Sequence, residues 1–452
     1  MLRLFDTAQG KVLPLELREP GKVSMYVCGP TVYGPPHLGH GRFSLVFDVL
    51  RRYLIWSGLD VTYVSNITDI DDKIINRAND EDRAWTDIAT RCETVWWDAM
   101  DAIGVMRPDH DPHATAYVTQ MVDLVADLLE RGDAYVSDDG VYFSPAVVDD
   151  YGLLARQSLE SLQAGARVEV AEHKRSPIDF ALWKFAKPGE PSWPSPWGDG
   201  RPGWHTECVV MSLDLLGDGF DIHGGGLDLA FPHHENERAQ AVAGGHAFAR
   251  HWVHNGFVEV GGEKMSKSLG NFTNLLDLID STDQRAYRLL VLRAHYRSPL
   301  EISKATTDDA TAALKKLDTV ARLLAEADLP EAAPDPEALN RFRAAMDDDL
   351  DTPRAVALLS ELRRRANTAL DAEDDQDAAV AGAAFLEIAG ALGLVLDTGG
   401  REVPAEVLAV AARRDEARAA RDWALADALR DQLVADGWLV EDTPSGTQVR
   451  RA

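Results

Sequence analysis

The pattern of apolar and polar positions near the N-terminus predicts a strand, a helix and a second strand. Residues 22–28 (KVSMYVC) are rich in β-branched and aromatic side chains, as strands are. Apolar residues then recur at helical spacing over 39–57, with Gly58 just past the end, and 60–67 (DVTYVSNI) again has the composition of a strand. This order predicts a parallel sheet that binds ligands beyond the carboxyl ends of its strands.

The middle of the chain is less regular. A helix is expected over 117–132, followed by a hairpin over 134–144. The Trp- and Pro-rich stretch 188–204 (PGEPSWPSPWGDGRPGW) is interpreted as the trailing part of an insertion in the sheet domain. Strand and helix alternate again after Gly203.

Beyond Asn274 the pattern is almost entirely helical up to about residue 399. The acidic run 371–377 (DAEDDQD) is most simply a solvated loop, and 398–404 (TGGREVP) is a linker. The rest of the chain is expected to carry one strong helix over 406–437.

Length and composition restrict the class of protein. With 452 residues the chain should form several domains, and 45% hydrophobic with 27% charged residues is ordinary for a soluble protein. We see no membrane span or signal peptide. Three cysteines without a C-x-x-C pair suggest a reducing cytosol, which leaves Cys28 and Cys208 available as metal ligands and Cys92 as a small core residue.

The net charge of −28 argues against a general nucleic-acid binder, because phosphate contact depends on Lys and Arg. It does not exclude contact through local basic patches. Residues 401–452 sum to only −2, whereas 321–400 sum to −10.

The stretch DLAFPHHENERAQ places two histidines and two glutamates within five residues. On a helix, His233 and Glu237 share one face, whereas Glu235 points elsewhere. An imidazole and a carboxylate aimed together make half of a zinc site. The alternative is that these residues, with His234, form only a solvated face.

Two further stretches carry types of side chain that bind phosphate. HLGH (37–40) stands at a loop-to-helix junction, where free N–H groups attract anions and Gly39 permits close approach of a nucleotide. KMSKS (264–268) places Lys264 and Lys267 in a Gly-flanked loop, suited to a triphosphate. Ordinary loop histidines and a solvated basic loop are the alternatives.

The two stretches, in this order, resemble the signature motifs of class I aminoacyl-tRNA synthetases. The resemblance narrows to the cysteinyl-tRNA synthetases and runs from Tyr26 to Arg450. The motifs that carry it are MYVCGPTVYGPPHLGHGR, NITDIDDKII, GWHTECVVM, DIHGGGLDLAFPHHENE, EKMSKSLGN, MDDDLDTP and DWALADALRDQL with EDTPSGTQVR.

The resemblance implies one zinc ion per chain and an ATP-dependent reaction. The enzyme would join L-cysteine to AMP and then transfer it to the 3′ end of tRNA(Cys), with Mg²⁺ accompanying ATP. The zinc would select cysteine over serine through its thiolate. The implied zinc ligands are Cys28, Cys208, His233 and Glu237, and the implied ATP-binding residues are His37, Gly39, His40, Lys264 and Lys267, of which the histidines and lysines are also catalytic.

Further roles follow from the resemblance by position. Trp204 would close over the substrate cysteine, or else be ordinary aromatic core, and Asp228 would pair with its ammonium. Gly29, Thr31 and Thr68 would complete the pocket, with His223 nearby. Single-stranded anticodon bases suit guanidinium and aromatic groups, so the expected tRNA contacts are Arg413, Arg414, Arg418, Arg421 and Trp423; the alternative is a helix packed on its own domain.

The sequence departs from the family pattern at Gly34, Leu38, Gly41 and Asn76. Asn76 replaces a common lysine, so we do not infer an accessory persulfide activity. The main rival is the paralogous ligase that joins cysteine to an amino-sugar inositol in mycothiol synthesis; it lacks the extended C-terminal part. A second alternative is a tRNA-binding relative without catalytic activity. The intact HLGH and KMSKS motifs argue against this alternative.

The expected fold class is α/β: a Rossmann-like parallel-sheet catalytic domain with an insertion, then an α-helical bundle and a small C-terminal domain. We expect a cytoplasmic monomer without a membrane partner. The expected divisions are 1–114 (first half of the catalytic domain), 115–202 (insertion), 203–272 (second half with the KMSKS loop), 273–399 (helical stem and DALR-like bundle) and 400–452 (anticodon recognition).

Overall fold

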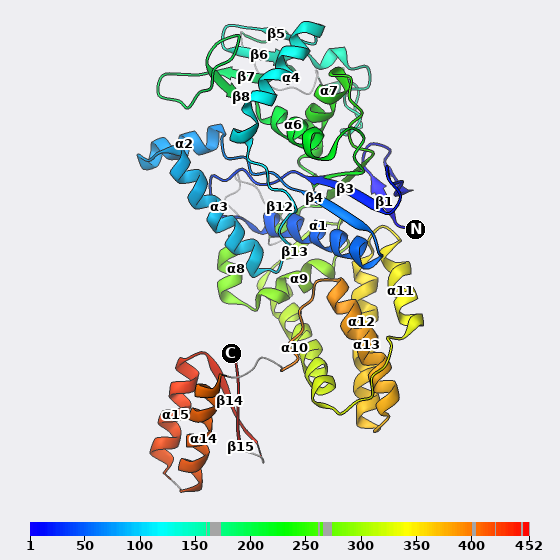
Figure 1. Ribbon diagram of the computed structural model, residues 1–452, viewed down its shortest axis with the longest axis vertical. Helices are drawn as coiled ribbons and strands as arrows, with labels where there is room; N and C mark the ends of the chain where they lie inside the picture. The colour runs from blue at the N-terminus through cyan, green and yellow to red at the C-terminus, as the bar shows by residue number, and fades with distance from the viewer. Residues whose placement is uncertain are drawn as a thin grey trace.

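An α/β body, a helical bundle and a small C-terminal unit follow one another in the computed structural model (Figure 1). The residues that the structure describes are 1–159, 161–162, 173–260, 263–264, 274–399, 404–420, 422–443 and 446–451.

A four-stranded parallel sheet forms the centre of the α/β body. Its order is β10–β9–β3–β4, and every neighbouring pair is parallel. The bounds are β3 (Lys22–Val27), β4 (Asp60–Val64), β9 (Ile222–Gly226) and β10 (His251–Asn255). The chain leaves β3 toward β4 on one side, whereas β9 lies on the other side, so the strand order reverses between β3 and β9. The carboxyl ends at such a reversal are where open parallel sheets bind ligands.

Helix α1 (Leu38–Trp56) is the predicted crossover between β3 and β4. Its apolar face, including Leu45, Phe47 and Leu50, is almost completely buried. A Cβ on Gly224 of β9 would lie 2.3 Å from the Phe47 ring, so this close packing of helix on sheet requires glycine there. The predicted βαβ unit is therefore confirmed.

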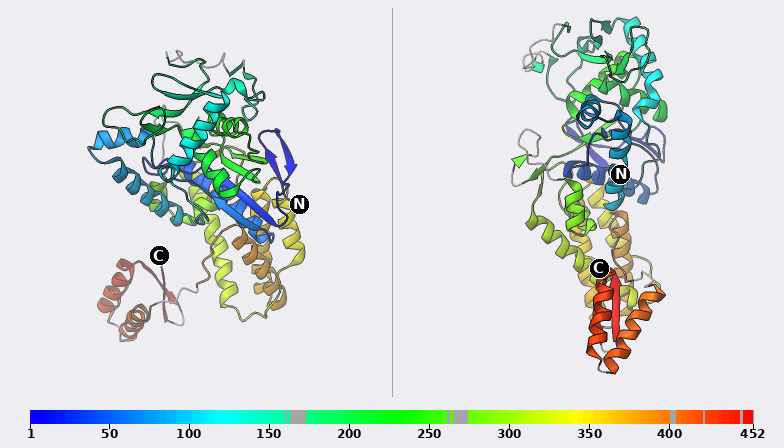
Figure 2. Two further views of the ribbon diagram at one scale, coloured as in Figure 1. Left: turned by 45° about the horizontal axis from the view of Figure 1, so that its top comes forward. Right: turned by 90° about the vertical axis from the view of Figure 1, so that its left-hand side faces the viewer.

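The insertion is a second layer above the sheet (Figures 1 and 2). It contains a four-stranded antiparallel sheet, β5–β6–β7–β8, packed on α4 around the buried Trp183. The helix and hairpin expected there are confirmed. The bounds are η1 (Ala114–Tyr117), α4 (Val118–Arg131), β5 (Ala134–Val136), β6 (Gly140–Phe143), η2 (Pro145–Val147), β7 (Phe180–Phe185) and β8 (Gly200–Pro202).

The remaining elements of the α/β body flank the two sheets. Strand β11 pairs with β12, which contains Lys264, and with β13 further along the chain. The bounds are β1 (Arg3–Asp6), β2 (Lys11–Pro14), α2 (Asp72–Glu81), α3 (Trp85–Ala102), α6 (Trp204–Leu216), η3 (Ala230–His234), α7 (Glu235–Ala243), β11 (Val258–Val260), β12 (Glu263–Lys264), α8 (Leu275–Ser281), α9 (Gln284–Leu292) and β13 (Leu300–Ile302).

Apart from β13, the regular elements between Leu275 and Ala391 are helices, as predicted. The bundle consists of α10 (Lys304–Glu326), α11 (Pro336–Met346), α12 (Thr352–Asp371) and α13 (Asp375–Ala391), and its core is continuous with that of the α/β body. The acidic run 371–377 is mostly exposed, as expected, but only 372–374 form the turn between α12 and α13, because Asp371 ends α12 and Asp375 begins α13. None of the helices in the described part of the chain is both long and apolar enough to cross a bilayer.

The prediction of one C-terminal helix is wrong. The structure has α14 (Ala405–Ala419) and α15 (Trp423–Ala435), followed by an antiparallel hairpin of β14 (Trp438–Thr443) and β15 (Gly446–Arg451). The Asp422 side chain accepts a hydrogen bond from the Leu425 N–H at 3.1 Å and so begins a new helix. The helical spacing of apolar residues continues from α14 into α15, so the sequence pattern alone did not reveal the break between these helices.

Candidate active site and metal centre

Four side chains that can bind a metal converge at the reversal point of the parallel sheet. Cys28 follows β3, Cys208 lies on α6, His233 lies in the turn before α7, and Glu237 lies in the first turn of α7. One ligand atom from each lies within 4.8 Å of the others, and all four residues are buried. The structure thus brings together the four residues implied as zinc ligands.

The helical spacing explains half of this cluster. His233 Nε2 lies 2.9 Å from Glu237 Oε1, one turn further along. Glu235 faces away and accepts a hydrogen bond from the Leu154 N–H at 2.6 Å. The prediction that His233 and Glu237 point to one place and Glu235 to another is confirmed, whereas the solvated-face alternative is wrong because all three are buried.

The distances between ligand atoms fit one tetrahedral zinc ion. Tetrahedral coordination would place two sulfurs about 3.8 Å apart, a sulfur and a nitrogen about 3.6 Å, and a nitrogen and an oxygen about 3.3 Å. The Cys28 and Cys208 sulfurs are 3.6 Å apart, and Cys208 Sγ is 3.7 Å from His233 Nε2. Cys28 Sγ is 3.4 Å from Glu237 Oε1. These distances, and the 2.9 Å between His233 Nε2 and Glu237 Oε1, lie within about 0.5 Å of the tetrahedral values.

The four groups differ in protonation. Burial raises the pKa of the Cys28 thiol well above its usual value, and the Cys208 sulfur adds to this effect. Burial also acts to raise the pKa of Cys208, but hydrogen bonds with Cys28 and His233 lower it to about 6. Burial acts to lower the pKa of His233, yet the Glu237 carboxylate raises it to about 10. Burial acts to raise the pKa of Glu237, but His233 and His223 lower it well below its usual value. Negative charge is therefore favoured on Cys208 and Glu237, and a proton is favoured on Cys28 and His233.

A second layer of histidines supports the cluster. His223 Nε2 lies 2.7 Å from Glu237 Oε2, which confirms the expectation that His223 lies near the site. His234 Nδ1 lies 2.8 Å from His254 Nε2, and His254 Nδ1 lies 2.7 Å from Thr7 Oγ1. Sequence reasoning missed His254, because a histidine inside the strand 251–255 gives no sign of the contact it makes.

Aromatic groups cover one side of His233. The Trp204 ring stacks on the His233 ring with centroids 4.0 Å apart, and Lys73 Nζ lies 6.0 Å from the Trp204 ring centroid. His205 Nδ1 lies 2.8 Å from His233 Nδ1, and burial lowers the pKa of His205 well below its usual value. Trp204 therefore lies beside the metal cluster rather than in a distant core.

Most of the residues expected to complete a cysteine pocket follow β3 and β4 at the carboxyl ends of these strands. Gly29 follows Cys28, and Thr31 forms an isolated bridge with Thr68. Thr68 is buried and donates a hydrogen bond to Glu207, which sequence reasoning did not single out. Asp228, in contrast, is exposed on the turn after β9.

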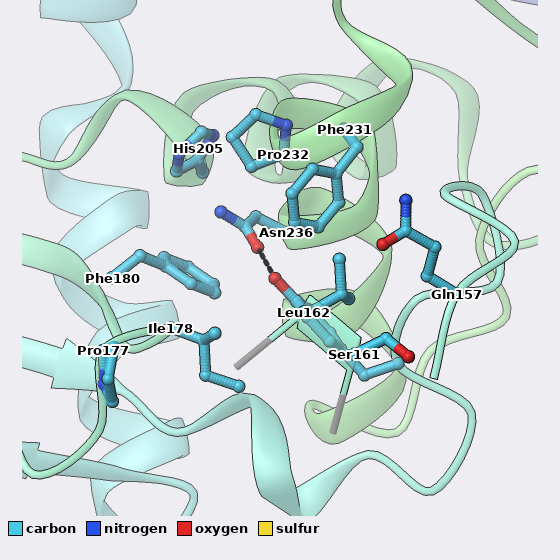
Figure 3. Close-up of a pocket in the computed structure, with 11 residues that line it drawn as sticks. Gln157, Ser161, Leu162, Pro177, Ile178, Phe180, His205, Phe231, Pro232 and Asn236 are labelled. Carbon is cyan, nitrogen blue, oxygen red and sulfur yellow. Dashed lines mark hydrogen bonds between the residues drawn. The ribbon is translucent and has the colours of Figure 1, made fainter. Parts of the chain in front are cut away.

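A cavity of about 510 Å³ lies on the insertion side of His205 (Figure 3). Its lining is mainly apolar, and the Tyr151 hydroxyl donates a hydrogen bond to Asn236 across it at 2.6 Å. The other lining residues are Gln157, Ser161, Leu162, Pro177, Ile178, Phe180, Phe231 and Pro232.

His37 and His40 cap helix α1 reciprocally. His37 Nδ1 accepts from the His40 N–H at 3.3 Å, and His40 Nδ1 accepts from the His37 N–H at 3.2 Å. The rings stack with centroids 3.6 Å apart. Because each Nδ1 is an acceptor, a neutral ring carries its proton on Nε2, which makes it a donor of the kind that binds phosphate oxygen.

The glycines of this motif allow tight packing. A Cβ on Gly39 would lie 3.0 Å from two atoms of the His37 ring, so a side chain there would require the ring to move by a few tenths of an ångström. A Cβ on Gly41 would lie 2.8 Å from the Tyr287 ring. The Tyr287 hydroxyl donates to the Leu38 carbonyl at 2.6 Å, so this tyrosine secures the beginning of α1.

The main chain on both sides of the lysine loop is positioned, although Lys267 and the side chain of Lys264 lie outside what the structure describes. Lys264 is paired with Glu259 in the β11–β12 hairpin. After the loop, Asn274 forms a bridge with His37, and the Leu275 N–H donates to the Pro36 carbonyl at 3.0 Å. The end of the loop at Asn274 therefore lies beside the start of the HLGH segment.

The C-terminal arginines differ in exposure. Arg413 is exposed and Trp423 is 59% exposed, whereas Arg414 is buried and donates to Thr447 Oγ1 at 2.6 Å. Arg418 is half-buried, and Arg421 lies outside the described residues. For Arg414, the geometry agrees with the alternative of a helix packed on its own domain.

Comparison with known proteins assigns the chain to a family. The class I (C) tRNA synthetase catalytic domain matches residues 14–312, and the DALR domain matches residues 341–397. The cysteine--tRNA ligases of Alkalilimnicola ehrlichii and Halorhodospira halophila are 49% and 47% identical to the chain, with complete coverage of both chains in each pair. Methionyl-tRNA synthetase of Mycobacterium tuberculosis has a similar fold, with a TM-score of 0.62 at 15% identity over 82% of this chain and 89% of that chain. The catalytic-domain match and the full-length relatives show that the chain belongs to the cysteine--tRNA ligase family of class I aminoacyl-tRNA synthetases.

Proposed function

We propose that this protein activates L-cysteine with ATP and transfers it to the 3′ end of tRNA(Cys). In the first step a cysteine carboxylate oxygen attacks the α-phosphorus of ATP, which forms cysteinyl-adenylate and releases pyrophosphate. In the second step a terminal ribose hydroxyl attacks the activated carbonyl and releases AMP. The observation that carries this proposal is the buried Cys28–Cys208–His233–Glu237 cluster, whose first member follows β3, the strand that precedes the HLGH segment and α1.

We assign zinc to this cluster, because two sulfurs, one imidazole and one carboxylate are a ligand set typical of zinc. When bound, zinc would favour a soft thiolate over a serine hydroxyl. His223 is hydrogen-bonded to Glu237 and His205 to His233. These two contacts fix the orientation of the Glu237 and His233 side chains toward the metal position.

We assign His37, Gly39, His40, Lys264 and Lys267 to ATP. The Nε2–H groups of the two histidines would donate to phosphate oxygens at the N-terminus of α1. The lysines would stabilise the negative charge that develops on the pyrophosphate, with Mg²⁺ accompanying ATP.

The cysteine pocket is proposed to consist of Gly29, Thr31, Thr68, Trp204 and Asp228. Trp204 already lies against His233 and can cover the bound amino acid. Asp228 would pair with the α-ammonium from the exposed turn after β9.

The proposed division of labour follows the expected boundaries. Residues 1–114 and 203–272 would form the catalytic domain, with 115–202 inserted and 273–399 as stem and bundle, and 400–452 would read the anticodon. Arg413 and Trp423 are exposed on the surface of that unit, and Arg418 and Arg421 belong to the same segment. We expect the protein to work as a cytoplasmic monomer.

The direct test is ATP-dependent loading of radiolabelled cysteine onto tRNA(Cys), compared with loading onto the amino-sugar inositol acceptor of mycothiol synthesis. Full-length relatives named cysteine--tRNA ligase, together with the DALR domain, favour tRNA as acceptor. We expect acid-precipitable cysteinyl-tRNA and no amino-sugar product. Product formed only with the amino sugar would overturn the proposal.

A further inference from the structure

A buried amide connects the metal cluster to the proposed cysteine pocket. Asn66 lies just after β4 and is 1% exposed. Its Oδ1 accepts hydrogen bonds from the Gly29 N–H at 2.9 Å and from the Tyr26 hydroxyl at 3.1 Å. Its Nδ2 donates to Thr68 Oγ1 at 3.2 Å. One side chain thus ties the ends of β3 and β4 together.

The directions of these bonds are determined by chemistry. A backbone N–H can only donate, so the Gly29 N–H requires the oxygen of Asn66 to face it. The amide nitrogen of Asn66 must then face Thr68, to which it can only donate. The Asn66 amide therefore has one orientation.

The Thr68 hydroxyl is oriented from the other side by Glu207, which is also 1% exposed. Thr68 Oγ1 donates its only proton to Glu207 Oε2 at 2.7 Å. Burial raises the pKa of Glu207 well above its usual value, and Oε2 remains an acceptor when the carboxyl proton is on Oε1. A hydroxyl has one proton and two lone pairs, and Asn66 occupies one lone pair. One acceptor position on Thr68 is therefore left for a donor from the substrate.

The same amide lies next to the metal ligands. Asn66 Oδ1 is 3.7 Å from Cys208 Sγ, and Gly29 directly follows Cys28. An amino acid whose side chain reaches the metal would thus have its own N–H donors near Thr68. The α-ammonium is the donor group that every amino acid carries.

We propose that Asn66 is a positioning residue for amino-acid selection, which, together with Glu207, keeps the Thr68 oxygen as an acceptor for the α-ammonium of cysteine. The inference rests on the proposed function. Asn66 acts through Thr68 and Gly29 and does not bind the metal.

Asn66→Asp tests this role, because Asp keeps an oxygen for Gly29 and Tyr26 but presents a second oxygen, instead of a donor, to Thr68. In cysteine-dependent pyrophosphate exchange with zinc-loaded full-length protein, we expect the KM for cysteine to rise about tenfold, as for loss of one hydrogen bond with a charged group. The KM for ATP and the zinc content should not change. An added negative charge that merely attracted the ammonium would lower the KM for cysteine, which is the opposite sign.

A double-mutant cycle with Thr68→Val shows whether Asn66 acts through the hydroxyl. In the Thr68→Val background, Asn66→Asp should change the KM for cysteine by less than about threefold, because the group it orients is gone. Asn255→Asp, at a buried asparagine whose Nδ2 donates to the Gly256 carbonyl at 3.0 Å, is the matched control and should show no such coupling.

The outcomes are distinct. An unchanged KM for cysteine in Asn66→Asp, an equal effect in both backgrounds, or loss of zinc would overturn the positioning role. If Asn66→Asp does not fold, Glu207→Met provides a second test, because it removes the acceptor of the Thr68 hydroxyl proton. Glu207→Met should raise the KM for cysteine, and this effect should also shrink in the Thr68→Val background. Failure of the wild-type protein to exchange pyrophosphate with cysteine would instead overturn the proposed function.

Discussion

At the scale of residues, the metal cluster combines what local spacing predicts with what only the fold can bring together. His233 and Glu237 are one helical turn apart, and their meeting followed from the sequence alone. Cys28 and Cys208 are far apart in the chain, and only the family resemblance suggested that they meet. His254 and Glu207 were not found, because the pairing of strands and loops decides which buried polar groups touch.

Replacing a ligand should remove the metal. Cys208→Ser and His233→Ala each leave three ligands of the four, so we expect zinc to fall from about one per chain to well below half after chelator washing. Metal analysis by mass spectrometry measures this. Cys92→Ser, at a buried cysteine outside the cluster, is the matched control and should retain zinc. Full zinc occupancy in both ligand variants would contradict the assignment.

Binding of zinc should release protons. Metal ligands must be deprotonated, and at pH 7.5 the Cys28 thiol, whose pKa burial raises, and the His233 imidazolium, with a pKa of about 10, still hold theirs. The pKa of Cys208, about 6, leaves it ionised already. We therefore expect release of about two protons per zinc and an affinity that rises with pH. Titration calorimetry in buffers of different ionisation enthalpy measures the number of protons released per zinc ion bound. If no protons are released, the ligands are already deprotonated before zinc binds, which would contradict this prediction.

At the scale of elements, the sequence predicted the parts that depend on periodicity and composition. The βαβ unit, the helix and hairpin of the insertion, and the helical region all match. The break before α15 and the hairpin β14–β15 did not follow from the pattern, because the Asp422 cap lies inside a continuous apolar periodicity. The reciprocal capping of α1 by His37 and His40 also required the structure, since either ring could equally have faced solvent.

Gly39→Ala should disturb this cap. A methyl group 3.0 Å from two His37 ring atoms displaces that ring by a few tenths of an ångström, and with it the Nε2–H donor. We expect cysteine-dependent pyrophosphate exchange to fall by at least about tenfold, since small displacements of positioning groups are costly. Zinc content should remain unchanged. Gly390→Ala is the matched control, because a Cβ there has no atom within 4 Å, and an equal loss in both variants would contradict the account.

At the scale of the whole molecule, the acidic balance is distributed unevenly. The net charge is −28, yet the last 52 residues sum to only −2. That unit has its own small core, in which Ala411, Leu433, Trp438 and Val449 are buried. The residues assigned to activation all lie between Cys28 and Lys267, outside this unit.

Deletion of 400–452 should therefore separate the two steps. We expect cysteine-dependent pyrophosphate exchange to remain within about twofold of wild type, whereas charging of tRNA(Cys) falls steeply and more so as salt rises. The shortened protein must first be shown to be soluble and to unfold at the same temperature as the corresponding domains of the full-length protein, so that misfolding is not mistaken for loss of tRNA binding. A folded deletion protein that charges tRNA(Cys) as well as the full chain would contradict the anticodon role.

The central claim is that the buried cluster selects cysteine through a metal-bound thiolate. It is tested most directly by comparing cysteine- and serine-dependent pyrophosphate exchange in zinc-loaded protein. We predict kcat/KM for serine below about one thousandth of that for cysteine, because a hydroxyl is a poor ligand and a site built around one contact rejects a substrate that cannot make it. Serine-dependent exchange within about tenfold of the cysteine rate would contradict the claim.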